Sequence, residues 1–142
     1  MFRATPIALS FHALIIILLG MLAGFPYGSQ IVAQAAEDTI RAWRVAHLEG
    51  LSNGLFLLVI AAIWQYMRPS KSLGKVVWWF LVLGGYANIV APIIAAATGY
   101  RGLEPTGPFV NWLIFGIYQL AFLLFPAALL SAVSLGRQLR SA

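Results

Sequence analysis

The chain has 142 residues, of which 61% are hydrophobic and only 9% are charged. A soluble domain carries about 25% charged residues because its surface faces water, so this composition excludes an ordinary soluble protein. The sequence contains no cysteine, which excludes disulfides, thiolate metal sites and c-type haem attachment. The net charge of +5 comes mostly from basic residues at the ends of apolar segments, where lipid headgroups lie, so we expect no nucleic-acid partner.

Four apolar segments follow one another along the chain and predict transmembrane helices. They occupy residues 6–25, 45–67, 76–98 and 109–135. About 20 helical residues cross the roughly 30 Å of hydrocarbon in a bilayer, and each segment reaches or exceeds that length. The first segment is too long for a signal peptide and lacks a good cleavage site, so we expect it to be retained. The prediction is one all-α domain over residues 1–142, a polytopic membrane bundle of four helices.

The charges in the loops predict an orientation. The basic residues assigned to one side are Arg3, Arg68, Lys71, Lys75, Arg137 and Arg140. The opposite side receives three arginines and all four acidic residues, Glu37, Asp38, Glu49 and Glu104. By the positive-inside rule both termini are cytoplasmic, in a multi-pass protein of a bacterial-type inner membrane. A long external loop is expected over residues 26–44, with a helical stretch at the lipid interface from residue 34.

Polar side chains within the apolar segments are the first candidates for function, because hydrocarbon is a costly environment for them. Asn53 lies nine positions after Arg44, and Asn88 lies ten positions before Thr98 on the next helix. At 1.5 Å per residue, both amides fall roughly 13–15 Å from the same surface. Tyr118 lies at a similar depth on the fourth segment. Buried asparagines and tyrosines also serve ordinary packing, so a structural role stays open for all three.

His47 borders a stripe of small residues on the second segment, formed by Ala46, Gly50 and Gly54. Such a stripe allows another helix, or a flat cofactor, to approach the backbone closely. Helix packing is the commoner explanation for a stripe of this kind. A histidine near the interface is likewise more often solvated than a ligand, and the same interpretation applies to His12 on the first segment.

The supply of chemical groups limits the possible reactions. We find no Ser-His-Asp arrangement, no His-Glu-x-x-His motif and no glycine-rich phosphate loop. With every carboxylate expected outside the hydrocarbon, a proton-coupled transporter is disfavoured. One histidine is too few for zinc, which takes three or four protein ligands. Haem supplies four nitrogens of its own, so His47 alone suffices as an axial ligand, and haem is the cofactor most compatible with this sequence.

The sequence resembles the styrene oxide isomerase family. The main match is the segment from Arg44 to Gly54, in which a histidine precedes an Asn-Gly pair by six positions. Further matches are the segments from Gly85 to Asn88 and from Arg101 to Leu103, together with His12. The resemblance implies a homotrimer of four-helix subunits that binds haem b between neighbouring subunits and rearranges a small apolar epoxide to an aldehyde or ketone. It implies His47 as the axial iron ligand, Gly50 and Gly54 beside the cofactor, and Asn53 facing the bound oxygen.

Two positions depart from the family pattern. The family's substrate-positioning tyrosine aligns with Pro92, and an aspartate of the family aligns with Gly84. Tyr86 or Tyr118 could supply a phenol from elsewhere, so Asn53, Asn88 and Tyr118 are the candidate catalytic residues. Two alternatives stay open: a haem-binding membrane protein with a role in sensing, haem handling or electron transfer, and an accessory membrane protein without a cofactor. In every case membrane lipid and a homo-oligomer are the expected partners.

Overall fold

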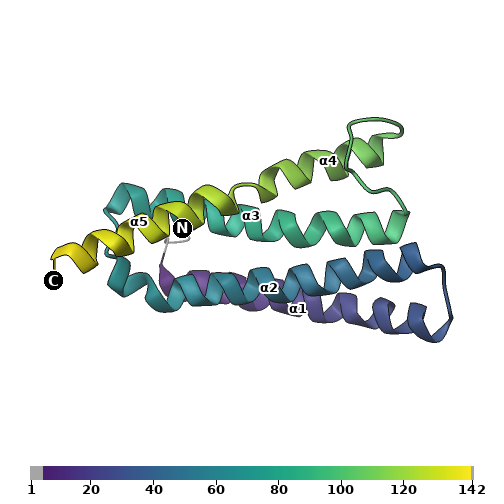
Figure 1. The fold of residues 1–142 in the computed structure, drawn as a ribbon, viewed down its shortest axis with the longest axis horizontal. Helices are drawn as coiled ribbons and strands as arrows, with labels where there is room; N and C mark the ends of the chain where they lie inside the picture. The colour runs from purple at the N-terminus through teal and green to yellow at the C-terminus, as the bar shows by residue number, and fades with distance from the viewer. Residues whose placement is uncertain (1–4, 142) are drawn as a thin grey trace.

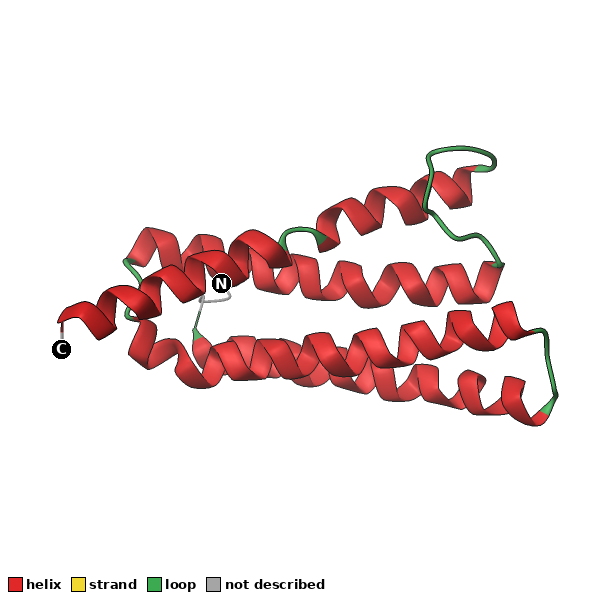
Figure 2. Ribbon diagram, in the orientation of Figure 1, coloured by secondary structure: helices red, strands yellow, loops and turns green. Residues whose placement is uncertain are grey.

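The computed structural model describes residues 5–141, which form five helices in an elongated bundle (Figure 1, Figure 2). These helices are α1 (Pro6–Val32), α2 (Glu37–Met67), α3 (Lys71–Thr98), α4 (Phe109–Ala121) and α5 (Leu124–Ser141). Four stretches are long and apolar enough to cross a membrane, because α4 and α5 together make one of them. No strand occurs within residues 5–141, so the predicted all-α membrane bundle with four spans is confirmed.

Several helix boundaries follow from local capping groups. The hydroxyl of Thr5 accepts a hydrogen bond from a backbone N–H of the first turn of α1 at 3.2 Å, and Pro6 begins that helix. Ser70 caps α3 in the same way, accepting from Leu73 at 3.4 Å. The helix α3 ends at Gly99, whose φ of 78° is a left-handed conformation that glycine adopts without strain.

The first two helices are longer than the sequence predicted. Helix α1 continues past Phe25 to Val32 and α2 already begins at Glu37, so the long loop expected over residues 26–44 is reduced to residues 33–36. Pro26 lies inside α1, where it removes one backbone hydrogen bond without ending the helix. The helical stretch expected at the interface is therefore the first part of α2. Similarly, α3 begins at Lys71 rather than at residue 76.

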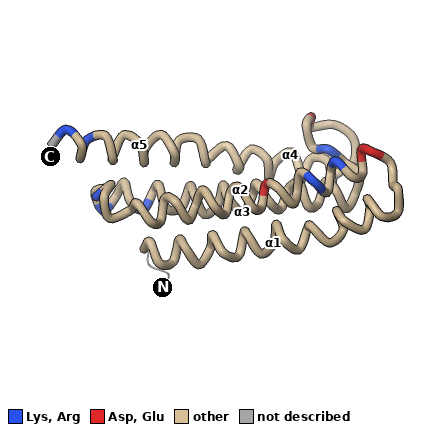
Figure 3. Tube along the Cα trace, turned by 60° about the horizontal axis from the view of Figure 1, so that its bottom comes forward, with Lys and Arg blue, Asp and Glu red and all other residues tan. Residues whose placement is uncertain are grey.

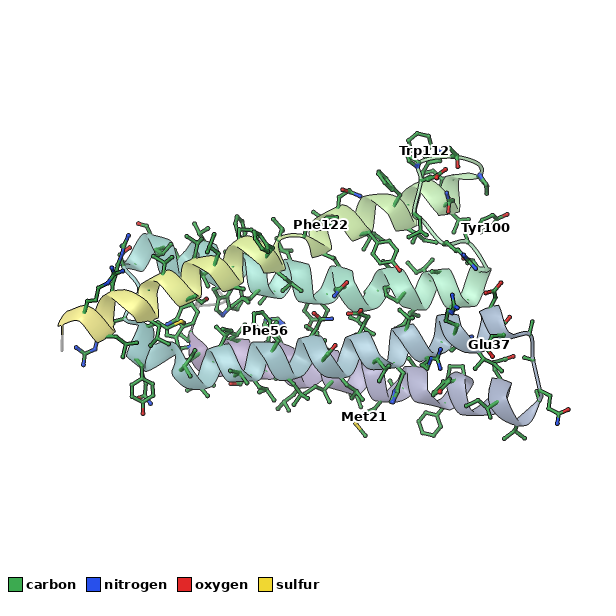
Figure 4. All side chains as sticks on the ribbon, in the orientation of Figure 1. Met21, Glu37, Phe56, Tyr100, Trp112 and Phe122 are labelled. Carbon is green, nitrogen blue, oxygen red and sulfur yellow. The ribbon has the colours of Figure 1, made fainter. Side chains whose placement is uncertain are left out.

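The fourth span is broken, whereas one continuous helix over residues 109–135 was expected. Phe122 lies at the junction between α4 and α5 (Figure 4). Pro126 has no N–H to donate to the carbonyl of Phe122, which instead accepts from Phe125 at 3.1 Å in a tighter turn. Helix α5 restarts at Leu124 and runs on to Ser141. This break lets α4 take a direction different from that of α5.

The tight part of the bundle is formed by α1, α2 and α3, with α5 packed on α3. Its largest buried side chains include Leu9, Ile16, Leu57, Trp78, Leu81 and Ile89. In contrast, Ile114 is the only buried residue of α4, and this helix diverges from α3 along the bundle (Figure 1). Helix α4 therefore buries less of its surface than the other helices of the bundle, and the side of the molecule that it forms is the more open one.

Charged residues gather at the two ends of the bundle. Figure 3 shows basic residues at the end where α1 begins and α5 ends, and residues of both signs at the opposite end. The basic residues of the first end are Arg68, Lys71, Lys75, Arg137 and Arg140. This is the asymmetry that predicts cytoplasmic termini, and the orientation itself stays a prediction. Arg3, which contributed to it, lies outside the described residues.

Candidate active site

A polar cluster joins α2 to α3 midway along the bundle, where Figure 4 shows nitrogen and oxygen atoms between the two helices. Nδ2 of Asn53 donates to Oε2 of Glu49 at 2.8 Å and to the carbonyl oxygen of the same residue at 2.7 Å. Nδ2 of Asn88, on α3, donates to the same Oε2 at 2.9 Å. The predicted shared depth of Asn53 and Asn88 is therefore confirmed.

Glu49 is the residue of this cluster that the sequence analysis assigned wrongly. It was grouped with the external carboxylates, but its side chain lies in the same layer as the two amides. The missed signal is its spacing, because positions i and i+4 of a helix lie on one face and Glu49 precedes Asn53 by four residues. A carboxylate within a membrane-spanning helix is by default a candidate functional group. Within residues 5–141 no ion pair involves Glu49.

The partners of the amides determine what each can offer to a ligand. Glu49 contributes a carbonyl and a carboxylate oxygen to Asn53, and both groups only accept hydrogen bonds. Both N–H groups of Asn53 are therefore used within α2. Asn53 is also buried, at 8% exposure. In this structure it has no N–H left to face a bound oxygen, so that predicted role has no geometric support.

The larger of two adjoining cavities, of about 480 Å³, lies between α3, α4 and the start of α5. Most of its wall is apolar, and its polar side chains are Asn88, Tyr118 and Gln119. The structure thus brings Asn88 and Tyr118 together at one cavity, beside the polar cluster.

The loop between α3 and α4 closes one side of this cavity and is fastened by Asn111. Oδ1 of Asn111 accepts from the backbone N–H of Gly102 at 2.8 Å, and its Nδ2 donates to the carbonyls of Glu104 and Thr106, each at 2.8 Å. Gly102 has a φ of 61° and packs against Ile114, where a Cβ has no room. Gly102 and the following leucine line the cavity as a result.

A smaller cavity of about 200 Å³ adjoins this site and is lined in part by charged residues. It shares Leu103 and Tyr118 with the larger cavity, and charged residues of α2 and of the α3–α4 loop line its outer part. There Arg101 forms an ion pair with Asp38 at 3.2 Å. Tyr118 therefore lines both the larger, mostly apolar cavity and the smaller cavity with charged residues in its wall.

Tyr86, the other phenol considered from the sequence, belongs to a different cluster. Its hydroxyl lies 3.0 Å from Nδ1 of His12, and the rings of His12 and Trp78 meet edge to face with centroids 5.5 Å apart. The sequence suggested a solvated His12. The structure instead packs His12 against these two side chains in the bundle. Of the two tyrosines, only Tyr118 lines the cavity.

His47 lies on the other side of α2, against α1. Its Nδ1 is 2.8 Å from the carbonyl oxygen of Gly20, its ring stacks on Tyr27 with centroids 6.1 Å apart, and Gly24 leaves room for it. A carbonyl oxygen can only accept, so Nδ1 is the donor, and in this tautomer of the neutral ring the lone pair is on Nε2. Across residues 5–141, Nε2 of His47 makes no hydrogen bond. Such an arrangement is typical of a histidine that ligates a metal through Nε2.

The donor set fits a macrocyclic cofactor better than a bare ion. The described residues contain no group of three or more histidine, cysteine or acidic side chains that could hold a metal. A metal ion bound through His47 therefore needs ligands from another source, and haem brings four. The residues present thus fit haem with His47 as its protein ligand, and haem binding stays a prediction.

Gly50 and Gly54 face α1 instead of an open groove. A Cβ on Gly50 would collide with the backbone of Gly20, and a Cβ on Gly54 would collide with Ile17 and the carbonyl of Ala13. This close approach of α1 and α2 accounts for both glycines through helix packing. Their predicted contact with a cofactor has no support in the geometry of the single chain.

Comparison with known sequences places these features in a family. Residues 7–137 match the profile of the family described as styrene oxide isomerase. The chain belongs to the styrene oxide isomerase family. It is 34% identical over 85 residues to hydroxylaminobenzene mutase HabB of Ectopseudomonas oleovorans, a match that covers 60% of this chain and 48% of the relative. It is 27% identical over 86 residues to hydroxylaminobenzene mutase HabA of the same organism, covering 61% and 58%.

The two mutases extend beyond the matched region, since the chain spans about half the length of these curated relatives. Family membership and these relatives make the protein a member of a group of membrane isomerases and mutases. Such enzymes rearrange atoms within one substrate molecule.

The structure shows what replaces the two residues that depart from the styrene oxide isomerase family. A Cβ on Gly84 would approach Leu124 to 2.9 Å, so α5 occupies the space that an aspartate side chain needs. Pro92 is buried and lines the smaller cavity beside Tyr118. A carboxylate and a phenol are nevertheless present in this region, from Glu49 on α2 and Tyr118 on α4.

Proposed function

We propose that this protein is a membrane-bound isomerase that rearranges a small aryl epoxide to an aldehyde or ketone. The observation that carries the proposal is the apolar cavity of about 480 Å³, whose few polar side chains include Asn88 and Tyr118. Sites for small molecules commonly enclose about 300–1,000 Å³ with mostly apolar walls and a few placed polar groups. Membership of the styrene oxide isomerase family supports the reaction type.

The reaction is balanced without any second substrate. The bond between the benzylic carbon and the epoxide oxygen breaks, and a hydride moves from the neighbouring carbon to the benzylic carbon. The oxygen then forms a carbonyl with the carbon that lost the hydride, so no atom or electron enters or leaves. Phe115, Phe122 and Phe125 line the cavity and exclude water, which would otherwise trap the cationic substrate as a diol. The hydroxyl of Tyr118 donates a hydrogen bond to the epoxide oxygen.

The cofactor proposed for this reaction is haem b, held by His47. The hydrogen bond from Nδ1 of His47 to the carbonyl of Gly20 fixes the ring and leaves Nε2 as the ligating atom. Tyr27 stacks on the same ring and restricts its rotation. When bound, haem supplies a Lewis-acidic iron that polarises the oxygen of the substrate.

His47 and the larger cavity lie on different faces of the chain, which supports the proposed homo-oligomer. The contacts of His47 come from α1, whereas the cavity is lined by α3, α4, α5 and the loop between α3 and α4. A head-to-tail interface places the α1–α2 face of one subunit against the α3–α4 face of the next, and such an interface forms a ring when the rotation between subunits closes. A homotrimer is the smallest ring of this kind, and it brings each histidine to a neighbouring cavity.

A second candidate substrate is an N-aryl hydroxylamine. Both curated relatives are named hydroxylaminobenzene mutases, and HabB is 34% identical to this chain over the matched region. The hydroxyl group then moves within the substrate, from nitrogen to the ring, again without net oxidation or reduction. The same cavity serves this reaction, because both substrates combine a flat apolar ring with a reactive bond to oxygen.

The proposal is tested by supplying both substrates to membranes that contain the protein. Styrene oxide and hydroxylaminobenzene are incubated separately, with membranes from cells that carry an empty vector as the control, and products are identified by mass spectrometry. We expect phenylacetaldehyde from the epoxide at a rate that scales with the amount of protein. Formation of aminophenol alone would transfer the proposal to the second candidate. Absence of both products, with haem supplied, would contradict isomerase function.

A further inference from the structure

Asn88 can present either a donor or an acceptor to the larger cavity, whose wall it helps to form. An asparagine amide carries two N–H donors on one atom and a carbonyl oxygen on the other. Which of the two a ligand meets depends on the part that the protein holds in place. In this structure Nδ2 of Asn88 is held by Oε2 of Glu49 at 2.9 Å.

Glu49 imposes this orientation on the amide. Oε2 of Glu49 accepts hydrogen bonds from both amides, so Asn88 turns an N–H group toward it. The hydrogen bond from Asn53 to the same oxygen, at 2.8 Å, keeps Glu49 in place. The amide orientation of Asn88 thus follows from the chemistry of Glu49 and not only from steric fit.

The carbonyl oxygen of Asn88 is left available to a ligand. Among the described residues, Oδ1 of Asn88 has no hydrogen-bond partner. No fully buried side-chain oxygen or nitrogen in residues 5–141 lacks a partner, so this oxygen is not fully buried. The cavity therefore presents an acceptor at Asn88, whereas the hydroxyl of Tyr118 can donate.

We propose that Glu49 is a positioning residue that makes the cavity select ligands carrying a hydrogen-bond donor, by fixing Asn88 with its carbonyl oxygen toward the ligand. This inference rests on the proposed function, because it concerns the same cavity. An N-aryl hydroxylamine offers both N–H and O–H to this oxygen, while an epoxide offers only an acceptor. Glu49 thereby sets the ratio in which the two classes of substrate are used.

A binding experiment tests the inference without requiring turnover. Phenol, which donates, and anisole, which only accepts, are titrated into the full chain in detergent, and the two dissociation constants are compared. Wild type is expected to bind phenol about tenfold more tightly, which corresponds to about 1.4 kcal/mol. In Glu49→Gln the ratio falls close to one, because a glutamine both donates and accepts and Asn88 is free to turn.

Glu37→Gln is the matched control, since it removes the same charge from the exposed first turn of the same helix. It is expected to keep the tenfold preference for phenol. Folding of each variant is checked by circular dichroism and size-exclusion chromatography. If Glu49→Gln does not fold, Asn88→Ala decides, because it removes the acceptor directly and must also abolish the preference.

Two results would overturn the inference. One is a wild type that binds phenol and anisole equally. The other is a folded Glu49→Gln or Asn88→Ala variant that keeps the full preference for phenol. Failure of the proposed function is a separate result, since it appears as absent turnover of both substrates while the binding ratio still responds to Glu49. Where turnover is present, Glu49→Gln raises KM for hydroxylaminobenzene more than for styrene oxide, with a smaller change in kcat.

Discussion

Nδ1 of His47 lies 2.8 Å from the carbonyl oxygen of Gly20 on the neighbouring helix. This hydrogen bond determines which ring nitrogen carries the proton and leaves Nε2 with its lone pair. Gly20 also packs against Gly50, so this hydrogen bond lies at the close approach of α1 and α2. Gly20 thus takes part both in the packing of the two helices and in the orientation of His47, the proposed haem ligand.

The first prediction concerns this histidine. His47→Ala removes the proposed haem ligand, so the Soret band of the purified, haem-supplemented protein should disappear. His12→Gln is the control, because His12 bonds to Tyr86 in a separate cluster, and it should keep the band. An absorption spectrum of the oxidised and reduced proteins gives the answer. A Soret band of wild-type intensity in His47→Ala would remove His47 as the ligand.

The second prediction concerns the contact between α1 and α2. Gly50→Ala places a methyl group against the backbone of Gly20, which cannot move aside as a flexible side chain does. Overpacking of this kind costs about 1–3 kcal/mol, so thermal unfolding in detergent should occur at a lower temperature. Gly28→Ala, where no atom lies within 4 Å of the new methyl group, should be neutral or slightly stabilising. Equal unfolding temperatures for the two variants would refute the close contact.

The third prediction distinguishes the two candidate tyrosines. Tyr118→Phe removes the hydroxyl that lines the cavity, and loss of one donor to a developing oxyanion lowers kcat by about a hundredfold or more. The haem content should not change, because His47 and not Tyr118 is the proposed ligand. Tyr86→Phe should leave the rate within about threefold of wild type, since its hydroxyl faces His12. Initial rates with styrene oxide test this prediction. A larger loss of rate in Tyr86→Phe than in Tyr118→Phe would show that Tyr86, and not Tyr118, has this role.

The four membrane spans could be predicted from the sequence because their lengths and composition leave no other environment for them. Counting residues also placed Asn53 and Asn88 at one depth, since a helix has a fixed rise. Helix ends were less accessible to this reasoning. The polar residues after Pro26 were assigned to a loop, but a helix that emerges into headgroups can carry polar residues and tolerate one proline.

The site was predictable only in part, for physical reasons that particular residues show. Glu49 was grouped with the external carboxylates, and its inward direction depends on the rotation of α2, which the loop charges do not reveal. The stripe of Gly50 and Gly54 was compatible with either another helix or a flat cofactor. The structure shows that the helix α1 packs against it. The cavity at Tyr118 depends on the break at Phe122, whose effect on the direction of α4 cannot be read from hydropathy.

The most direct test of isomerase function follows the atoms of the substrate. Styrene oxide that carries deuterium at both positions of its terminal carbon is incubated with the protein, and the product is reduced with borohydride at once and examined by NMR. An intramolecular shift predicts that both deuterium atoms are retained, one of them on the benzylic carbon. Loss of the migrating deuterium to solvent, or formation of a diol as the main product, would contradict the account.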